Sequence, residues 1–368
     1  MSTSQPTPVR GRFAPSPSGR MHLGNLCCAL LAWLSVRSQN GEMLLRIEDL
    51  DPDRCTREKA ELLMDDLTWL GLTWDEGPGH ERTHATYYQS ARRELYESAL
   101  SELRAKNDVY PCFCTRAELH AVSAPHAGDG TFRYPGLCRN LTPAEAEEKS
   151  RTRRPSLRFR APDESVTFED LYCGPQNINV QSTFGDFIVR RSDGVHAYQL
   201  AVTVDDALMG VTEVVRGRDL LPSTGCQIQL FHALGHTPPH YGHIPLLVNR
   251  DGRRLSKRER DLDIGVLRTR FTPEELLGRM ANLLGFLDRP EKITLTELIP
   301  VYKAWYETAD TPKFPKNCRL LLIVLLISSI VSSSPPKYFS IRSSSSSDRK
   351  STRLNSSHTA LSRMPSSA

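Results

Sequence analysis

The chain has 368 residues, of which 39% are hydrophobic and 24% charged, a balance that is usual for a globular protein and excludes a collagen-like or wholly low-complexity chain. This length leaves room for roughly two or three domains and a sizeable buried core. The formal net charge is only +4, and residues 318–368 alone hold seven Lys or Arg against one Asp, so the rest of the chain carries about −2. Overall charge therefore indicates no nucleic-acid partner, and any RNA-binding surface must come from local patches.

The cysteines and the amino-terminal residues bear on the cellular compartment. Nine cysteines are scattered along the chain, and residues 1–8 are short, polar and proline-containing, unlike a secretory signal. We therefore expect a reducing, cytoplasmic location, with the thiols free or bound to metal.

Residues 12–25 form the first informative segment, Arg-Phe-Ala-Pro-Ser-Pro-Ser-Gly-Arg-Met-His-Leu-Gly-Asn. Its prolines and glycines predict a tight turn, and the apolar residues that follow at helical spacing predict a helix opening at about Asn25. Such a turn directs backbone N–H groups and the positive end of the helix dipole at one point, where His22 adds a further donor. This arrangement suits the phosphate chain of a nucleotide, whereas a simple turn before a core helix is the alternative.

A strand and a helix are predicted next. Residues 43–47 are a short apolar run typical of a buried strand, on which Arg46 and Glu48 should share one face. Because ligands of open α/β sheets bind at the carboxyl ends of strands, Glu48 is placed to contact one. A helix should start at Asp51-Pro52 and end at Gly71, with a buried stripe made of Leu62, Leu63, Leu67 and Leu70. This alternation indicates an α/β, Rossmann-like fold.

An insertion with a different composition is expected between about Tyr110 and Pro175. It contains three thiols and a phenol that lie close together in the sequence: Cys112, Cys114, Tyr134 and Cys138. Tetrahedral zinc accepts such a set, although tyrosine is an unusual ligand, and four protein ligands would make the site structural. His120 and His126 are rival fourth ligands, and three unligated thiols are the alternative to a metal site.

The second half of the chain predicts two hairpins and two helices. Residues 184–190 and 195–204 should pair around an Asp193-Gly194 turn, with Tyr198 in the middle of the second strand. A strand over 211–215 should end at Arg216, after which Asp219 should cap a helix over 220–234.

A second hairpin, over residues 246–252, should present the basic loop Arg254-Leu-Ser-Lys-Arg258. A helix over 272–284 should then end at Gly285. Taken alone, the basic loop would be a solvated surface segment.

Residues 12–25 and 254–258 resemble the HIGH and KMSKS signatures of class I aminoacyl-tRNA synthetases, in the same order and a domain's length apart. Two positions depart from those signatures: Asn25 replaces a second histidine, and Arg254 replaces the first lysine. Over about residues 10–290 the chain most resembles glutamyl-queuosine tRNA(Asp) synthetases, shortened paralogues of the glutamyl-tRNA synthetases.

Further motifs carry this closer resemblance: Arg46-Ile-Glu-Asp-Leu-Asp51, the cysteine-tyrosine set, Asp205-Asp206 and Gly210–Gly217. Residues 27–30 read Cys-Cys-Ala-Leu, where full-length glutamyl-tRNA synthetases usually carry Arg-Thr-Ala-Leu before continuing into an anticodon-binding domain. A truncated glutamyl-tRNA synthetase that charges the 3′ end of tRNA(Glu) is the runner-up. A nucleotidyltransferase of the same superfamily and a non-catalytic, zinc-containing tRNA-binding module are rival hypotheses from different functional classes.

The resemblance implies a fold, a reaction and partners. The fold is a Rossmann-like class I synthetase core with a small zinc-containing insertion. ATP, accompanied by Mg²⁺, activates L-glutamate to glutamyl-adenylate without tRNA, and glutamate then passes to the queuosine base in the anticodon loop of tRNA(Asp). We expect a monomer with no membrane partner.

Site residues follow motif by motif. Glutamate carries two carboxylates and an ammonium, so its pocket needs planar cations, which Arg12 and Arg216 provide, and an anion, which Glu48 provides. The full set expected to bind glutamate is Arg12, Phe13, Ala14, Pro15, Ser16, Glu48, Tyr198 and Arg216. The set expected to bind ATP is His22, Gly24, Asn25, Ser256 and Lys257, with His22 and Lys257 catalytic.

We expect five segments along the chain. Residues 10–109 and 176–290 form the two halves of the catalytic domain, 110–175 the insertion, 291–317 a short segment and 318–368 a tail. The tail holds an apolar run over 320–331, too short for a bilayer, and then serine-rich low complexity.

Residues 348–358 resemble a translated sequencing-library adapter. We therefore expect the chain to leave its authentic reading frame between about Asp288 and Cys318, and the tail to lack function. A tail anchor is the alternative.

Overall fold

The computed structural model describes residues 8–115, 117–119, 133–248, 263–308, 313–314 and 320–321. The predicted hairpin turn and basic loop, with Ser256 and Lys257, lie outside these ranges, as do His120 and His126. Among the helices described, none has the length and apolar character needed to cross a bilayer.

A six-stranded sheet forms the centre of the fold, in the order β2-β1-β8-β9-β5-β6. All neighbouring strands are parallel except β6, which pairs antiparallel with β5 at the edge. The strands are β1 (Arg10–Phe13), β2 (Glu42–Leu45), β5 (Ser165–Asp170), β6 (Gly174–Asn179), β8 (Glu213–Gly217) and β9 (His240–Ile244). This parallel arrangement confirms the predicted α/β, Rossmann-like class.

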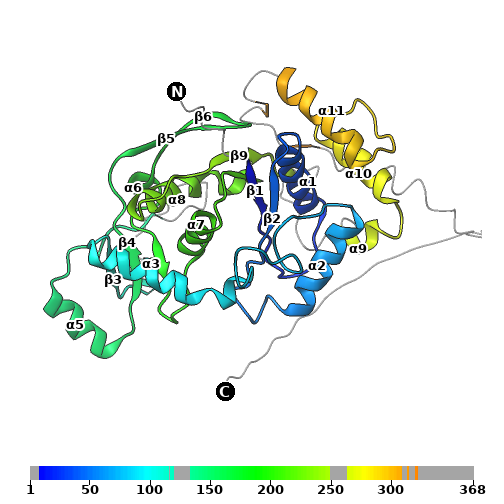
Figure 1. The fold of residues 1–368 in the computed structure, drawn as a ribbon. Coiled ribbons are helices and arrows are strands. Elements are labelled where there is room, and N and C mark those ends of the chain that lie inside the picture. The colour runs from blue at the N-terminus through cyan, green and yellow to red at the C-terminus, as the bar shows by residue number, and fades with distance from the viewer. Residues whose placement is uncertain are drawn as a thin grey trace, which may run out of the picture. The chain divides into compact units, whose positions relative to one another are not determined.

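Helix α1 (Leu23–Arg37) packs against β1 and β8, and Figure 1 shows it beside β1. It starts two residues before the predicted Asn25, and most of its surface is buried. Gly11 on β1 permits this close approach, because a Cβ there would meet Val36 Cγ2 at 2.2 Å. Parallel β1 and β2 then bring Arg12 beside Leu44.

A separate antiparallel sheet joins β3 (Val109–Cys112), β4 (Ser156–Phe159) and β7 (Ile188–Arg190). The remaining elements of this part of the chain are η1 (Gln89–Ala91), α3 (Arg93–Ala105), α5 (Pro143–Thr152) and α6 (Val180–Thr183). Thr142 caps α5 by accepting from the Glu145 N–H at 3.3 Å, while the Glu145 carboxylate accepts from the Thr142 N–H at 2.8 Å.

The carboxyl-terminal helices are α9 (Ile264–Leu267), α10 (Pro273–Leu283) and α11 (Leu295–Thr308). Helix α10 confirms the prediction, with Thr272 as its N-cap and Gly285 at φ +81° after its end. Helix α11 packs against α1 and α10. Its Tyr302 hydroxyl lies 2.9 Å from that of Tyr172. A short parallel pair, β10 (Leu247–Val248) with β11 (Leu320–Leu321), completes the described elements.

The predicted helix over 51–71 is shorter than expected. Helix α2 (Arg57–Trp69) begins after Thr56 rather than at Asp51, because residues 51–54 form a turn closed by the Arg54 N–H to the Asp51 carbonyl. Leu62 was wrongly placed in the buried stripe, since it is 46% exposed. The buried leucines, Leu63, Leu67 and Leu70, follow the i, i+4, i+7 spacing of one helix face, and Leu62 lies off that face.

The second strand of the predicted 184–204 hairpin was also wrong. Gly194 turns at φ +91° and Arg190 bridges His196, but residues 198–208 form helix α7 (Tyr198–Leu208). Its residues 200–206 are all buried, so the apolar run has no solvent face and carries no helical period.

Asp219 does not cap a helix. It lies in the short helix η2 (Arg218–Leu220), and α8 (Leu221–Ala233) follows with Leu220 as its N-cap and Pro222 in its first turn. A proline at this position needs no hydrogen-bond partner for its nitrogen, so the helix begins without a side-chain cap.

Candidate active site

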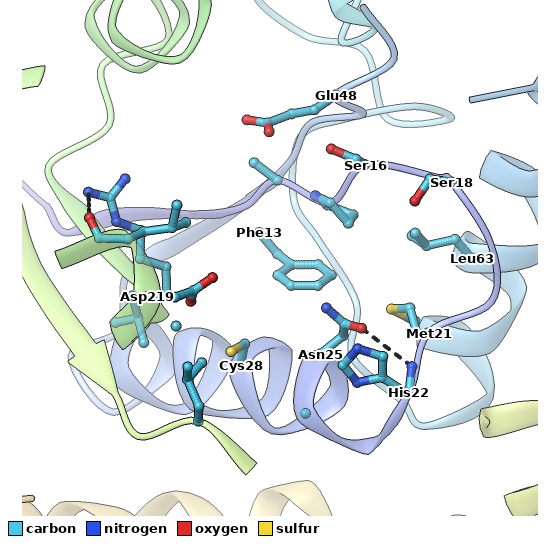
Figure 2. Close-up of a pocket in the computed structure, with 18 of the residues that line it drawn as sticks. Phe13, Ser16, Ser18, Met21, His22, Asn25, Cys28, Glu48, Leu63 and Asp219 are labelled. Atoms are coloured by element: carbon cyan, nitrogen blue, oxygen red, sulfur yellow. Dashed lines mark hydrogen bonds between the residues drawn. The ribbon is translucent and has the colours of Figure 1, made fainter. Parts of the chain in front are cut away.

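A cavity of about 490 Å³ opens where the carboxyl ends of β1 and β8 face the start of α1. Figure 2 shows side chains from these elements arranged around it. Every described residue that was predicted to bind glutamate or ATP lines it: Arg12, Phe13, Ala14, Pro15, Ser16, His22, Gly24, Asn25, Glu48, Tyr198 and Arg216. Parallel strand topology thus brings together residues that are far apart in the sequence.

Three charged groups occupy one part of the cavity. Arg12 lies on β1, Arg216 on β8, and Glu48 three residues after β2; each is no more than 9% exposed. Tyr198, the first residue of α7, adds a hydroxyl, and burial raises its pKa, so the group stays protonated at neutral pH. Two guanidinium groups, one carboxylate and one hydroxyl can receive a zwitterion that carries extra negative charge.

Glu48 also pairs with Arg46, whose Nη2 lies 3.4 Å from Glu48 Oε1. Burial raises the pKa of Glu48, and the charges of Arg46 and Arg12 oppose that shift. The ion pair and the cavity wall are therefore two roles of the same carboxylate.

A network of buried charges lies behind these groups. Arg46 is fully buried and donates to Asp206 Oδ1 at 2.7 Å, while Arg12 Nε lies 3.5 Å from the same oxygen. Asp205 receives Arg92 Nε at 2.7 Å. Helix α7 thus supplies carboxylates to Arg12 on β1, to Arg46 directly after β2 and to Arg92 at the start of α3.

The start of α1 forms the other part of the cavity. His22 is the N-cap of α1, and its backbone N–H donates to the Asn25 side chain at 3.4 Å (Figure 2). A Cβ at Gly24 would meet the His22 ring at 3.3 Å, so glycine lets the imidazole lie over the first turn. That turn carries no acidic residue, which leaves the positive helix end available to an anion.

Apart from the cavity, the structure holds a cluster of cysteines, which come from the end of β3 and from the segment that begins at residue 133. The sulfurs of Cys112, Cys114 and Cys138 lie within 4.8 Å of one another, with Cys114 and Cys138 at 3.6 Å. The Tyr134 hydroxyl lies 3.4 Å from Cys112 Sγ and 3.9 Å from Cys114 Sγ. Ligands of tetrahedral zinc at about 2.3 Å would stand roughly 3.8 Å apart, so this set has the right size for the ion.

The acidities of these thiols point the same way. Hydrogen bonding from Cys138 lowers the pKa of Cys112 to about 4, whereas the neighbouring Cys112 raises the pKa of Cys138. Ionisation of one thiol therefore disfavours ionisation of the next, and a bound cation would favour the thiolate forms.

Comparison with known proteins decides the family. The sequence profile of the family described as tRNA synthetases class I (E and Q), catalytic domain, matches residues 8–310. The chain belongs to this family.

Several synthetases resemble this one closely. A glutamyl-Q tRNA(Asp) synthetase from Symbiobacterium thermophilum is 51% identical over 79% of this chain and 91% of its own length. One from Nitratidesulfovibrio vulgaris is 48% identical over 84% of this chain and 90% of its own length. A glutamate–tRNA ligase from Sulfurihydrogenibium is 41% identical over 78% of this chain, which spans 60% of that ligase.

A solved structure of a glutamate tRNA ligase from Elizabethkingia meningosepticum, in complex with its amino acid, has the same fold. Its TM-score is 0.70 at 29% identity, with 80% of this synthetase chain and 64% of the solved chain covered. The chain thus spans less than two thirds of that protein.

Several lining residues of this synthetase were not predicted to lie in the site, among them Asp219 and Cys28. Asp219 faces the cavity instead of capping a helix, and Cys28 forms part of its wall (Figure 2). Burial, followed by the charge of Asp219, raises the pKa of Cys28 to about 12, so its thiol stays neutral. The Arg216-Gly-Arg-Asp219 run directly after a strand was the available signal for Asp219, because residues at strand carboxyl ends face ligands.

Proposed function

We propose that this synthetase uses ATP to activate L-glutamate to glutamyl-adenylate without tRNA, and transfers glutamate to the queuosine base in the anticodon loop of tRNA(Asp). One observation carries the proposal: a single cavity holds Arg12, Glu48 and Arg216 at one part and the start of α1 at another. An amino acid and a triphosphate can therefore meet in it.

Binding of glutamate uses the charged groups. Arg12 and Arg216 pair with its carboxylates and Glu48 with its ammonium, while the Tyr198 hydroxyl donates beside them. Phe13, Ala14, Pro15 and Ser16 form the wall that orients the substrate. Because no side chain has to form a covalent bond, catalysis rests on positioning and on stabilisation of charge.

Binding of ATP uses the start of α1. His22, Gly24 and Asn25 contact the phosphates, aided by the positive helix end, and Mg²⁺ accompanies the nucleotide. Lys257, with Ser256, neutralises the charge that develops on the leaving pyrophosphate.

The cysteine cluster holds a structural zinc ion. Cys112, Cys114, Cys138 and Tyr134 supply the ligands, and the Arg158 guanidinium lies over the Tyr134 ring, 3.6 Å from its centre. When bound, zinc joins β3 to the segment at 134–138; it takes no part in the reaction.

The choice of tRNA(Asp) rests on the relatives. Those named glutamyl-Q tRNA(Asp) synthetase are 51% and 48% identical to this chain, against 40% to 46% for six glutamate–tRNA ligases. Cys27-Cys28, at the position of Arg-Thr in glutamyl-tRNA synthetases, agrees with this choice.

Pyrophosphate exchange tests the activation step and separates the rival functions. We expect labelled pyrophosphate to enter ATP when glutamate is present and tRNA absent. Exchange that requires tRNA(Glu) would instead identify a glutamyl-tRNA synthetase. No exchange under either condition would favour a tRNA-binding module.

A further inference from the structure

Arg216 is held from behind by a row of side chains on three adjacent strands. Its β8 position faces His243 on β9, and Asp170 ends the next strand, β5. Arg216 Nε donates to His243 Nε2 at 3.0 Å, and His243 Nδ1 lies 2.5 Å from Asp170 Oδ2. His243 and Asp170 are both completely buried, and neither lines the cavity.

The partners determine which nitrogen of His243 carries the proton. A guanidinium N–H can only donate, so Nε2 must present its lone pair to Arg216. The Thr224 hydroxyl, 3.2 Å away, can also donate to Nε2. Nδ1 then carries the hydrogen and donates to the Asp170 carboxylate, which makes His243 a neutral ring with one defined tautomer.

Asp170 is itself fixed. Its Oδ1 accepts from the backbone N–H groups of Tyr172, Cys173 and His243, at 2.9 to 3.1 Å. Only Oδ2 therefore faces the imidazole. Burial, reinforced by the Arg216 charge, lowers the pKa of His243 to about 4 despite the opposing effect of Asp170, so the ring stays neutral at physiological pH.

The other nitrogens of Arg216 are held too. Nη1 donates to Gln227 Oε1 at 2.8 Å and Nη2 to Thr224 Oγ1 at 2.7 Å, both on α8. A guanidinium anchored through all three nitrogens cannot swing toward the cavity to follow a ligand. Its position before glutamate arrives is set by these residues.

We infer that the Asp170–His243 pair is a positioning device for glutamate recognition: Asp170 sets the tautomer of His243, which then fixes the guanidinium of Arg216 against the substrate carboxylate. The inference rests on the proposed function, in which Arg216 binds glutamate. It makes Asp170 and His243 positioning residues, since neither touches the substrate.

The isosteric change Asp170→Asn tests the tautomer. The three backbone donors at Oδ1 hold the amide oxygen there, so the new NH₂ group faces His243 Nδ1. The ring must then carry its hydrogen on Nε2, which sets two donors against each other at Arg216. An asparagine in place of the aspartate of an Asp–His pair is known to hold the wrong tautomer in other enzymes.

We expect Asp170→Asn to raise the glutamate KM in pyrophosphate exchange about tenfold or more and to leave the ATP KM within about twofold. Nitrogen NMR should find the hydrogen of His243 on Nδ1 in the wild type and on Nε2 in the variant. An unchanged glutamate KM, or a wild-type ring protonated on Nε2, would overturn the inference.

Two changes at His243 separate positioning from packing. Gln places its amide oxygen near Nε2 and keeps an acceptor for Arg216, whereas Asn places its amide near Nδ1 and keeps the donor to Asp170. Positioning predicts that His243→Gln retains a glutamate KM within about threefold while His243→Asn raises it about tenfold. A merely structural role predicts the reverse order, because Asn preserves the buried partner of Asp170.

The wild-type protein in the same assay separates a failure of the positioning inference from a failure of the proposed function. If the wild type shows glutamate-dependent exchange and all three variants have the same glutamate KM as the wild type, the positioning device is rejected and the proposed function stands. Absence of exchange in the wild type would overturn both.

Discussion

Buried charge is the dominant feature of the site at the scale of single residues. Three cations and three anions lie together almost without solvent contact: Arg12, Arg46, Arg92, Glu48, Asp205 and Asp206. Their charges balance, which makes the cluster tolerable in a buried setting but sensitive to the loss of any one member. Arg12, the ligand-facing arginine of this cluster, lies 3.5 Å from Asp206 within it.

Asp206→Ala is therefore expected to destabilise the protein by about 3–5 kcal/mol, because it leaves a buried positive charge uncompensated. Urea unfolding followed by circular dichroism measures the change. Asp65→Ala is the matched control: Asp65 pairs with Arg268 but is 61% exposed, so its removal should cost less than about 1 kcal/mol. Equal losses in the two variants would contradict this interpretation of the cluster.

The pKa of His243 leads to a dependence of stability on pH. Its folded-state pKa is about 4, below the ordinary 6.5, so the unfolded chain binds a proton that the folded chain does not. The contribution of His243 to the free energy of unfolding is fully present above about pH 6.5. It falls as the pH drops toward 4, by on the order of 3 kcal/mol. Denaturant titrations at several pH values should show a smaller decline for His243→Gln than for the wild type; parallel curves would refute the assignment.

At the scale of elements, the local sequence pattern predicted α10 correctly, which has one exposed face, but predicted α7 as a strand, because α7 is mostly buried. Helix α10 has a polar face and clear caps, and it was predicted almost to the residue. Helix α7 is buried around most of its surface, so its β-branched run resembled a strand. The polar partners behind the site, Asp206 and His243, were missed for a related reason: their contacts exist only once distant strands and helices are assembled.

The three-stranded sheet β3-β4-β7 supplies the prediction about metal. Cys112 ends β3, so loss of zinc should loosen this sheet from the segment at 134–138. We expect Cys138→Ser to reduce bound zinc from about one ion per chain to a small fraction and to lower the melting temperature by several degrees. Cys55→Ser, outside the cluster, should keep the ion. Elemental analysis and thermal scans test this, and wild-type protein purified without zinc would contradict it.

At the scale of the whole molecule, two motifs far apart in the sequence predicted the family. Only the first of them lies within the described residues, and there it lines the cavity at the carboxyl ends of the parallel strands. The order of the strands could not be predicted in this way, since β5, β8 and β9 meet only in the assembled sheet. Residues 291–308 fold onto the catalytic core as part of α11 and the segment before it, whose Ile293 is buried.

The tail supplies a prediction about truncation. Residues 328–368 lie outside the part of the chain that the structure describes, and the sequence predicts that they lack function. A chain that ends at residue 327 should therefore keep its rate of glutamate-dependent pyrophosphate exchange within about twofold. A loss of tenfold or more would show that the tail contributes to activity.

The proposed reaction is the transfer of glutamate, activated in this cavity, to queuosine. Incubation of the protein with ATP and radiolabelled glutamate, and with tRNA(Asp) that either contains or lacks queuosine, tests it most directly. We predict label only on the queuosine-containing tRNA(Asp), retained after the 3′ end is removed. Label on tRNA(Glu) at its 3′ end, with none on either form of tRNA(Asp), would contradict the account.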